Sequence, residues 1–296
     1  MLLEAFLDYL RLERNVSPRT LKAYRDDLIA FESFFKALEG DLTWQTVDTD
    51  VAREWVVSMM EKGNKAASIQ RRLSALRSCY RFLYKRGLVE HDPVHSLTAP
   101  KKERTLPAFV REQDMDRLLD TPGMFEESFE GRRDRLIIAI FYEAGLRLSE
   151  LVGLDMQSVN LAAQTLKVFG KGRKERIVPF GVELLHLINI YIGERALYVR
   201  DGDDREAFFL TAKGTRMTTG AVRDMVKVKL GLVTSQQKRS PHVLRHTFAT
   251  TMLNHEADLE SVKELLGHSR LQTTEIYTHT TFEELKKVYS EAHPRA

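Results

Sequence analysis

A basic stretch that contains prolines and has no apolar period divides this chain of 296 residues into two parts. The stretch, DPVHSLTAPKKERTLP at residues 92–107, is typical of an extended interdomain linker. Two domains are the natural expectation at this length, because each part can bury its own core. We therefore expect an N-terminal domain at residues 1–97, a linker at 98–107 and a second domain at 108–296.

The composition is that of a globular chain and leaves the kind of partner open. The formal net charge is only +3, too small by itself to indicate a nucleic-acid partner. Cys79 is the single cysteine, so no intrachain disulfide can form. Charged residues interrupt the start, MLLEAFLDYLRLERN, which excludes the apolar core of a signal peptide, and no apolar run is long enough to span a bilayer. We therefore expect a cytoplasmic protein without a membrane partner.

The first hundred residues have the periodicity of helices. Ser17 followed by Pro18 supplies a helix start, and another helix is predicted at 47–61 with Asp48 or Thr49 as its cap. The fourth predicted helix carries one apolar stripe, formed by Ile69, Leu73, Leu76, Tyr80 and Leu83.

The rest of this fourth helix is basic, and residues 62–89 contain no acidic side chain. Like charges one helical turn apart repel each other, a cost that a bound polyanion removes while counterions are released. An ordinary solvated helix face is the alternative interpretation. Together with basic residues of the linker and of a predicted hairpin, the expected DNA-binding residues are Arg71, Arg72, Arg77, Arg81, Lys101, Lys102, Lys174 and Arg176.

The second part begins with helices and then changes pattern. Helices are predicted at 111–119 and 132–143, followed by two short strands, TLKVF and ERIVP, on either side of a tight hairpin. Helices resume after Gly181, with a possible short strand at 207–211. The predicted fold class is therefore mainly α, with an N-terminal helical domain and an α-rich C-terminal domain that holds a small antiparallel β-sheet.

Six residues of the second part could together build a phosphoryl-transfer site. Each lies in a local motif: Arg147 in AGLRLSEL, Lys171 in GKGRKER, His242 and Arg245 in SPHVLRHTFAT, His268 in LLGHS, and Tyr277 in TTEIYTH. Any one of them is weak evidence, since such residues are common. Their joint occurrence in this order is what indicates a function.

Arg147 and Arg245 are the candidate ligands of a phosphodiester. A guanidinium group can bind two phosphoryl oxygens at once and does not lose its charge. Arg147 follows the predicted turn at Gly145, from which a side chain can face a cleft. A salt bridge between Arg147 and Glu150 is the alternative interpretation.

His242 is expected to act beside Arg245, because a spacing of three places both on one face of the helix that Pro241 would begin. His246 is expected to point elsewhere and to be buried. A zinc site is an alternative, since His242 and His246 are four residues apart. The glutamate of an HExxH motif is missing, however, and phosphate binding also explains Arg245. We therefore expect neither a metal nor another cofactor.

The other candidates would transfer a proton and form a covalent bond. Lys171 at a hairpin tip could donate a proton to a departing hydroxyl, or it could be a solvated turn lysine. His268 could bond a phosphoryl oxygen or cap a helix. Tyr277 is the expected nucleophile, since surrounding cations favour the phenolate and it follows shortly after the His268 motif. A tyrosine that packs in the core or at the surface, as expected of most of the other eight, is the alternative interpretation.

The complete series of Arg, Lys, His-x-x-Arg, His and Tyr resembles that of the tyrosine recombinase and integrase family, over essentially the whole chain. Within this family the chain is most similar to the Xer-type recombinases of bacterial chromosome dimer resolution. The compact length, the motif NVSPRTLKAYRDDL and the ending AHPRA carry this similarity.

The resemblance implies an enzyme that cuts and rejoins DNA at specific sites. Its SAM-like core-binding domain and its catalytic domain would clamp the duplex. Tyr277 would attack the scissile phosphate to give a 3′-phosphotyrosyl link and a free 5′-hydroxyl, with Lys171 as general acid. The arginines and histidines would stabilise the transition state, and neither a metal nor a nucleotide triphosphate would be needed.

The resemblance also implies partners. These are a double-stranded DNA recombination site, a tetramer on DNA, a second Xer-type recombinase and a cell-division DNA translocase. The final helix would dock on a neighbouring subunit through Phe282, Leu285, Val288 and Tyr289.

Several other functions share part of this pattern. An integrase of a mobile element uses the same chemistry but usually adds an arm-binding domain, and none is expected ahead of Leu3. A type IB topoisomerase would use similar residues as a monomer. A noncatalytic DNA-binding protein would not need all six candidates, and a small-molecule phosphotransferase would leave the basic first domain unexplained. The DNA sequence of the site and the dependence on a partner stay open.

Overall fold

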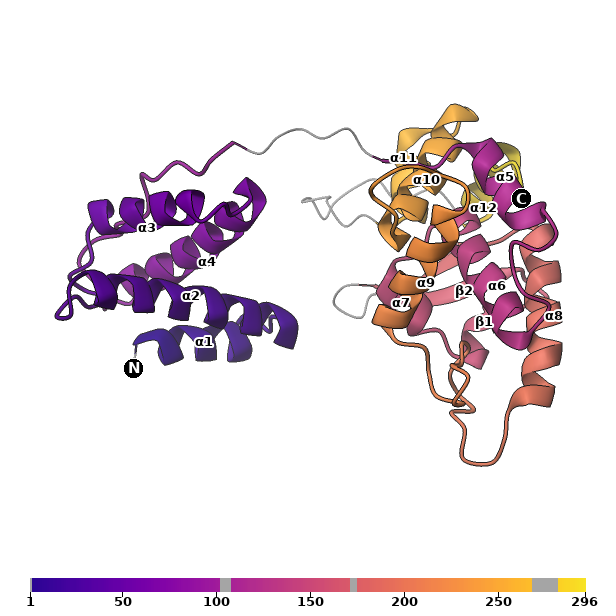
Figure 1. The fold of residues 1–296 in the computed structure, drawn as a ribbon, viewed down its shortest axis with the longest axis horizontal. Coiled ribbons are helices and arrows are strands. Elements are labelled where there is room, and N and C mark those ends of the chain that lie inside the picture. The colour runs from indigo at the N-terminus through magenta and orange to yellow at the C-terminus, as the bar shows by residue number, and fades with distance from the viewer. Residues whose placement is uncertain (1, 102–107, 171–174, 268–281) are drawn as a thin grey trace. The chain divides into compact units, whose positions relative to one another are not determined.

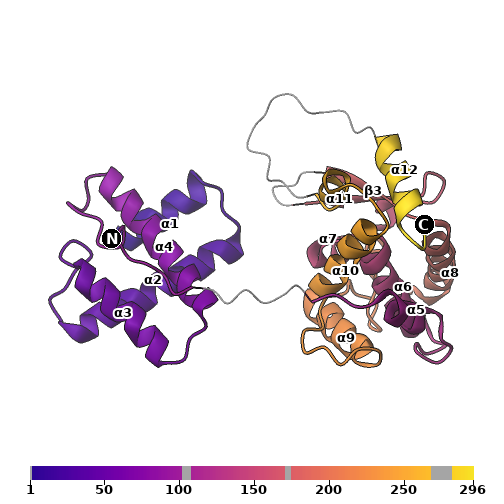
Figure 2. The same cartoon turned by 90° about the horizontal axis from the view of Figure 1, so that it is seen from above.

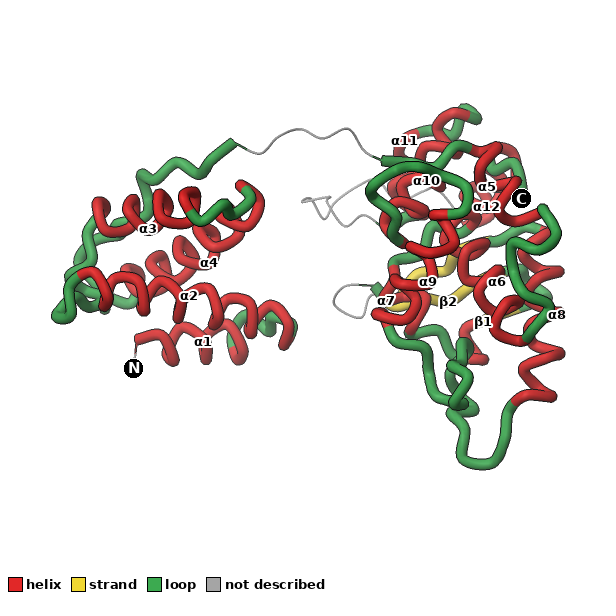
Figure 3. The backbone as a smooth tube through the Cα atoms, viewed as in Figure 1, coloured by secondary structure: helices red, strands yellow, loops and turns green. Residues whose placement is uncertain are grey.

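The computed structural model describes residues 2–101, 108–170, 175–267 and 282–296. Within these ranges the chain consists of helices and one small sheet (Figures 1 and 3), which confirms the predicted class. It forms two compact units, Met1–Thr105 and Leu106–Ala296. None of the helices in these ranges is long and apolar enough to cross a membrane.

The first unit is a bundle of helices with its own core. Ser17 caps the second helix by accepting a hydrogen bond from the amide of Thr20, and Asp48 caps the third in the same manner. The helices are α1 (Leu2–Leu12), α2 (Pro18–Leu38), α3 (Thr49–Glu61) and α4 (Ala66–Lys85).

The predicted apolar stripe of α4 lies in the core of this unit, and each of its five side chains is buried. Val94 and Leu97 are buried in the same core. The expectation that an extended linker starts at residue 92 is therefore wrong in this respect, because turns place these apolar side chains against the bundle. The Gln70 side chain also donates to the Pro100 carbonyl, at 2.8 Å.

In the second unit, helices pack against a small antiparallel sheet (Figure 1). The helix α6 lies in its core and packs against α8 and α10. Along the chain the elements are α5 (Glu112–Asp120), α6 (Phe129–Glu143), α7 (Leu148–Val152), the 3₁₀ turn η1 (Met156–Ser158), β1 (Val159–Asn160), β2 (Thr165–Phe169), β3 (Glu175–Pro179), α8 (Val182–Tyr198), α9 (Thr219–Gly231), α10 (Pro241–Asn254), α11 (Leu259–Leu265) and α12 (Phe282–Ala292).

The sheet has the order β1-β2-β3, and the strands predicted from TLKVF and ERIVP are confirmed as β2 and β3. Leu166 pairs with Val178, and both side chains face the core. The strand predicted at 207–211 is wrong. Ala207 and Leu210 form only isolated bridges, to Asp155 and Arg216. The ladders do not extend because the 3₁₀ turn follows Asp155 directly and the chain turns tightly between Thr211 and Thr215.

The final helix α12 packs against its own unit. Leu285 and Tyr289 are buried in a small cluster with Phe248 of α10, and Val288 packs against it. The chain then ends beside α8 (Figure 2), where a Cβ at Gly181 would lie 2.4 Å from the backbone of Ala296. Three of the four side chains that were expected to dock on a neighbouring subunit thus pack within the chain, whereas Phe282 is partly buried and lies outside this cluster. To reach another protomer, Leu285, Val288 and Tyr289 would have to leave these contacts.

Candidate active site

A pocket of about 430 Å³ brings together three of the six predicted catalytic residues, Arg147, His242 and Arg245. His242 and Arg245 lie on the first turns of α10, which begins at Pro241 as predicted. Arg147 is the N-cap residue of α7, so it reaches the pocket from the preceding turn. Residues 98 positions apart in the sequence, Arg147 and Arg245, therefore line one hollow.

The turn between α6 and α7 fits against α10 because it contains glycine. Gly145 has a φ of 59°, in the left-handed region that favours glycine. A Cβ there would lie 2.5 Å from the ring of Phe248. The Gly145 carbonyl also accepts a hydrogen bond from Arg245 Nη1 at 2.6 Å. Close approach at this turn is what places Arg147 beside α10.

A single buried carboxylate, that of Glu150, organises the arginines. It accepts hydrogen bonds from the Arg147 amide and from Arg147 Nη1, each at 2.7 Å. Arg176 of β3 binds it with both terminal nitrogens, at 2.5 and 2.9 Å. Arg245 Nη1 lies 4.0 Å from it. Three guanidinium groups therefore surround one carboxylate, and the excess positive charge makes this a favourable place for an anion.

The same arginines hold the end of α11, where backbone carbonyls lack helical partners. Arg176 Nε donates to the carbonyl of Leu265 at 3.2 Å. Arg245 Nη2 donates to the next carbonyl, that of Leu266, and Arg147 Nη2 donates to that of Gly267 at 2.7 Å. These contacts suit the negative end of the helix dipole.

The charge states follow from burial and from neighbouring charges. Burial tends to raise the pKa of Glu150, but hydrogen bonds and charges from Arg176 and Arg147 outweigh it and hold that pKa below its ordinary value. Burial, reinforced by Arg147, lowers the pKa of Arg245 to about 10, so Arg245 is still a cation at neutral pH. Burial and the nearby His246 and Arg245 lower the pKa of His242, which favours its neutral form.

His246 departs from expectation. It is only partly buried, and its ring meets that of His242 edge to face, with centroids 4.5 Å apart. The prediction that it points elsewhere is wrong, because residues four apart in a helix share a face. Among the described residues, no group of three or more His, Cys, Asp or Glu side chains is arranged to hold a metal ion.

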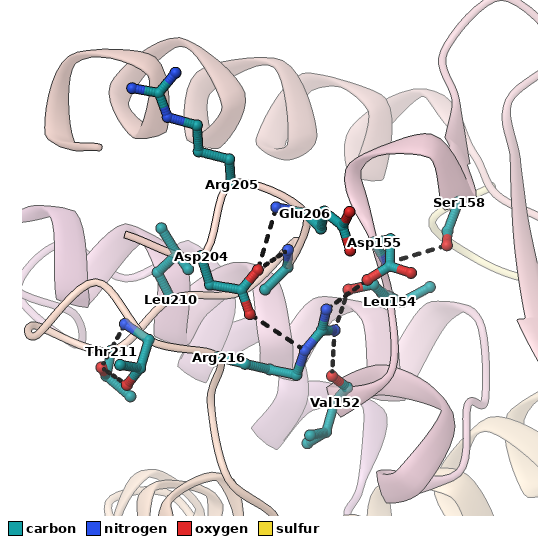
Figure 4. Close-up of polar contacts among 12 residues, drawn as sticks. Val152, Leu154, Asp155, Ser158, Asp204, Arg205, Glu206, Leu210, Thr211 and Arg216 are labelled. Atoms are coloured by element: carbon teal, nitrogen blue, oxygen red, sulfur yellow. Dashed lines mark hydrogen bonds and ion pairs between the residues drawn. The ribbon is translucent and has the colours of Figure 1, made fainter. Parts of the chain in front are cut away.

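The opposite end of α7 is held by Arg216, as Figure 4 shows. Its Nη1 donates to the carbonyls of Val152 and Leu154, at 3.1 and 2.9 Å. Its Nη2 binds the Asp155 carboxylate at 2.5 Å, and the carboxylate of Asp204 lies 3.7 Å from its Nε. The short helix that carries Glu150 is therefore tied to the unit at both ends.

Some predicted residues lie outside the described ranges. These are Lys102, Lys171, Lys174, His268 and Tyr277. A second pocket of about 310 Å³, near the loop between α5 and α6, includes none of the predicted catalytic residues in its lining.

The predicted DNA-binding residues of the first unit differ in their partners. Arg71 binds the carboxylate of Asp27, whose side chain is 5% exposed, and Arg72 lies 3.7 Å from that carboxylate. The guanidinium of Arg77 donates to backbone carbonyls after α4. Arg81 is exposed, as is Lys101 of the linker.

Glu150 is a residue of the site that the sequence motifs do not single out. From the sequence alone it is expected only as a salt-bridge partner of Arg147. The one sequence signal is its position three residues after that arginine, which any helix start could produce. Its pairing with Arg176, 26 residues away, depends on the fold.

Comparisons with known proteins show which family the chain resembles. The model of the phage integrase family matches residues 108–284, and that of the phage integrase N-terminal SAM-like domain matches residues 3–87. A tyrosine recombinase XerC from Azotobacter vinelandii is 42% identical over 294 residues, which cover 99% of this chain and 96% of the relative. A tyrosine recombinase XerC from Chlorobaculum tepidum is 40% identical over 314 residues, which cover 98% and 94%.

Solved structures share the fold. The XerH site-specific recombinase bound to its difH substrate has a TM-score of 0.69 at 24% identity, over 97% of this chain and 84% of that chain. The Tn1549 transposon integrase in complex with transposon right-end DNA has a TM-score of 0.71 at 19% identity, over 97% of each chain. The matched domains and the identity over nearly the full length show that this chain belongs to the phage integrase family of tyrosine recombinases.

Proposed function

We propose that this chain cuts and rejoins DNA at a specific recombination site, with Tyr277 forming a 3′-phosphotyrosyl link. The observation that carries the proposal is the pocket lined by Arg147, His242 and Arg245, whose two arginines lie beside the buried Glu150 carboxylate. Such a cluster can bind the nonbridging oxygens of a phosphodiester, on which negative charge develops during the attack.

Each polar group of the pocket has a distinct task in this proposal. Arg147 keeps its position through Glu150 while its 34% exposed side chain reaches the pocket. Arg245 supplies a buried charge, which acts strongly because little water screens it. A neutral His242 can donate one hydrogen bond to a phosphoryl oxygen. His268 would add a further donor, and Lys171 would protonate the departing 5′-oxygen.

The relatives named XerC support a more specific role in resolving chromosome dimers at cell division. The reaction would use four protomers on paired sites, with a second Xer-type recombinase as one partner. A cell-division DNA translocase would activate the assembly. A cytoplasmic location belongs to the same proposal, because the substrate would be chromosomal DNA.

A trapping experiment tests the chemistry. Nicked duplexes with candidate chromosomal-terminus sites are incubated with the protein, and the products are run on a denaturing gel. We expect a covalent adduct that Tyr277→Phe abolishes and that Tyr198→Phe retains, because the Tyr198 hydroxyl bonds Glu130 and the Ala212 carbonyl, neither of which lines the pocket.

Other outcomes would contradict the proposal. An adduct that persists in Tyr277→Phe would mean that another residue is the nucleophile. Relaxation of a supercoiled plasmid that carries no recombination site would favour a topoisomerase. DNA binding without an adduct, even after addition of the second recombinase of the same genome, would indicate a noncatalytic protein.

A further inference from the structure

All three nitrogens of the Arg176 guanidinium bind the protein itself. Nη1 and Nη2 hold the two oxygens of Glu150, at 2.5 and 2.9 Å, and Nε donates to the Leu265 carbonyl. Unlike Arg147 and Arg245, Arg176 is absent from the lining of the catalytic pocket. To reach a DNA phosphate, Arg176 would have to give up partners that are buried.

The two-pronged contact fixes the orientation of the Glu150 carboxylate. A planar guanidinium that binds both oxygens leaves the carboxylate little rotational freedom, which a single contact would not achieve. Arg147 hydrogen-bonds the same carboxylate, and Arg245 lies 4.0 Å from it. By fixing the orientation of the Glu150 carboxylate, Arg176 therefore also fixes the positions of Arg147 and Arg245, the two candidate phosphate ligands.

Arg176 also fixes the end of α11. It binds the first of three successive carbonyls there, and Arg245 and Arg147 bind the second and the third. A Cβ at Gly267 would lie 3.0 Å from Arg176 Cδ, so the two segments touch closely where Gly267 adopts a φ of 64°. Through one side chain, β3 is joined to α7 and to the end of α11.

We propose that Arg176 is a positioning residue for DNA cleavage. It sets the geometry of Arg147 and Arg245 through Glu150 and through the end of α11, and it does not contact DNA. This differs from the sequence-based expectation that Arg176 binds DNA directly. The inference rests on the proposed function, since it concerns the step at which the phosphate is attacked.

The test separates DNA binding from cleavage in the full chain. Arg176→Lys keeps the positive charge but cannot bind both oxygens of the Glu150 carboxylate at once. Arg205→Lys is the control, because Arg205 forms an exposed ion pair with Asp201. Binding of a nicked site duplex is measured over a range of salt, and cleavage is followed in a single turnover. For Arg176→Lys we expect unchanged affinity and salt slope, with cleavage of bound DNA slower by on the order of 100-fold. Arg205→Lys should match the wild type in both.

A double-variant cycle tests the route through Glu150. If Arg176 acts through this carboxylate, Glu150→Gln combined with Arg176→Lys should cleave no more slowly than the slower single variant. Losses that multiply would overturn this route. Weaker binding with a salt slope reduced by about 1, and normal cleavage once DNA is bound, would make Arg176 a phosphate ligand instead.

A purely structural role of Arg176 and a failure of the proposed function would each give a different result. A purely structural role would lower the melting temperature and the fraction of active protein, but leave the cleavage rate of that fraction unchanged. If both Arg176→Lys and Arg176→Gln lower the melting temperature but leave the cleavage rate of the active fraction unchanged, the inference is overturned. If the wild type forms no adduct, the proposed function fails, whereas an adduct formed at the same rate by Arg176→Lys overturns only the role of Arg176.

Discussion

Two glutamates of the second unit are fully buried, yet their surroundings act on them in opposite directions. Glu150 meets two guanidinium groups with good hydrogen-bond geometry, so its pKa is held low. Arg295 lies beside Glu143, with Nε at 3.4 Å, but among the described residues neither oxygen of Glu143 has a hydrogen-bond partner. Burial accordingly raises the pKa of Glu143 to about 8. The number of paired donors, more than burial itself, decides the charge of each residue.

The raised pKa of Glu143 predicts how folding stability depends on pH. The folded state binds this proton more tightly than the unfolded state, whose ordinary pKa is 4.5. The resulting stabilisation is fully present below pH 4.5 and is lost as the pH rises through 8, at up to about 1.4 kcal/mol per pH unit. Glu143→Gln should therefore gain stability relative to the wild type between pH 5 and pH 8.5.

Melting temperatures of both proteins across this pH range check the prediction. Glu291→Gln is the control, because the Glu291 side chain is 65% exposed. It should follow the wild type at every pH. Parallel pH curves for Glu143→Gln and the wild type would show that Glu143 keeps the same charge in the folded and unfolded states.

At the scale of elements, the site depends on where short segments begin and end. The α6–α7 turn and the end of α11 contribute backbone carbonyls, and the start of α10 contributes the Arg245 side chain, which binds both of these segments. Arg147 also binds the end of α11. Arg216 completes the arrangement by holding the other end of α7. The catalytic pocket is thus built from element termini, whose free carbonyls are available as acceptors.

Substitution at the α6–α7 turn should be costly for this reason. Gly145→Ala combines a left-handed φ with a contact of 2.5 Å to the Phe248 ring, and we expect a loss of about 2–5 kcal/mol in the free energy of unfolding. Gly123→Ala is the matched control, since Gly123 has a φ of 85° but no atom within 4 Å of an added Cβ. Urea unfolding should show a much smaller loss for Gly123→Ala, and equal losses would mean that the Phe248 contact costs nothing.

At the scale of the whole molecule, each of the two units has its own core, and basic residues occur in both. The net charge of +3 says little about DNA, whereas residues 62–89 contain basic side chains and no acid. Arg71 is a poor probe of this surface, because it also neutralises the buried Asp27, whose pKa burial raises. Its reversal would lower stability as well as binding.

Arg81 gives a cleaner test of the DNA surface. It is exposed and has no hydrogen-bond or ion-pair partner within the described part of the chain. Arg81→Glu should weaken binding of duplex DNA and reduce the salt slope by about 1, with an unchanged melting temperature. Arg11→Glu in α1 serves as the control. Equal effects of the two substitutions on the salt slope would argue against α4 as the specific DNA surface.

Local features of the structure could be read from the sequence. The strands at TLKVF and ERIVP, the caps at Ser17 and Asp48 and the buried stripe of α4 follow from periodicity, turn residues and capping chemistry, which act over a few neighbouring positions. The position of His242 and Arg245 on one face of α10 could also be predicted from their spacing, although His246 lies on that side of the helix as well.

What the sequence determined by itself was therefore the fold class, the longer helices of the first unit, the hairpin strands and the residue types from which a phosphate site can be made. Only the tertiary structure decided which arginines line the pocket and which bind groups of the protein itself. Arg147 and Arg245 line a pocket, while the equally basic Arg176 is bound to Glu150 and Leu265, and Arg71 to Asp27, 44 residues away. Guanidinium groups are chemically identical, so their roles depend on partners that are distant in the sequence and that folding brings within hydrogen-bond reach.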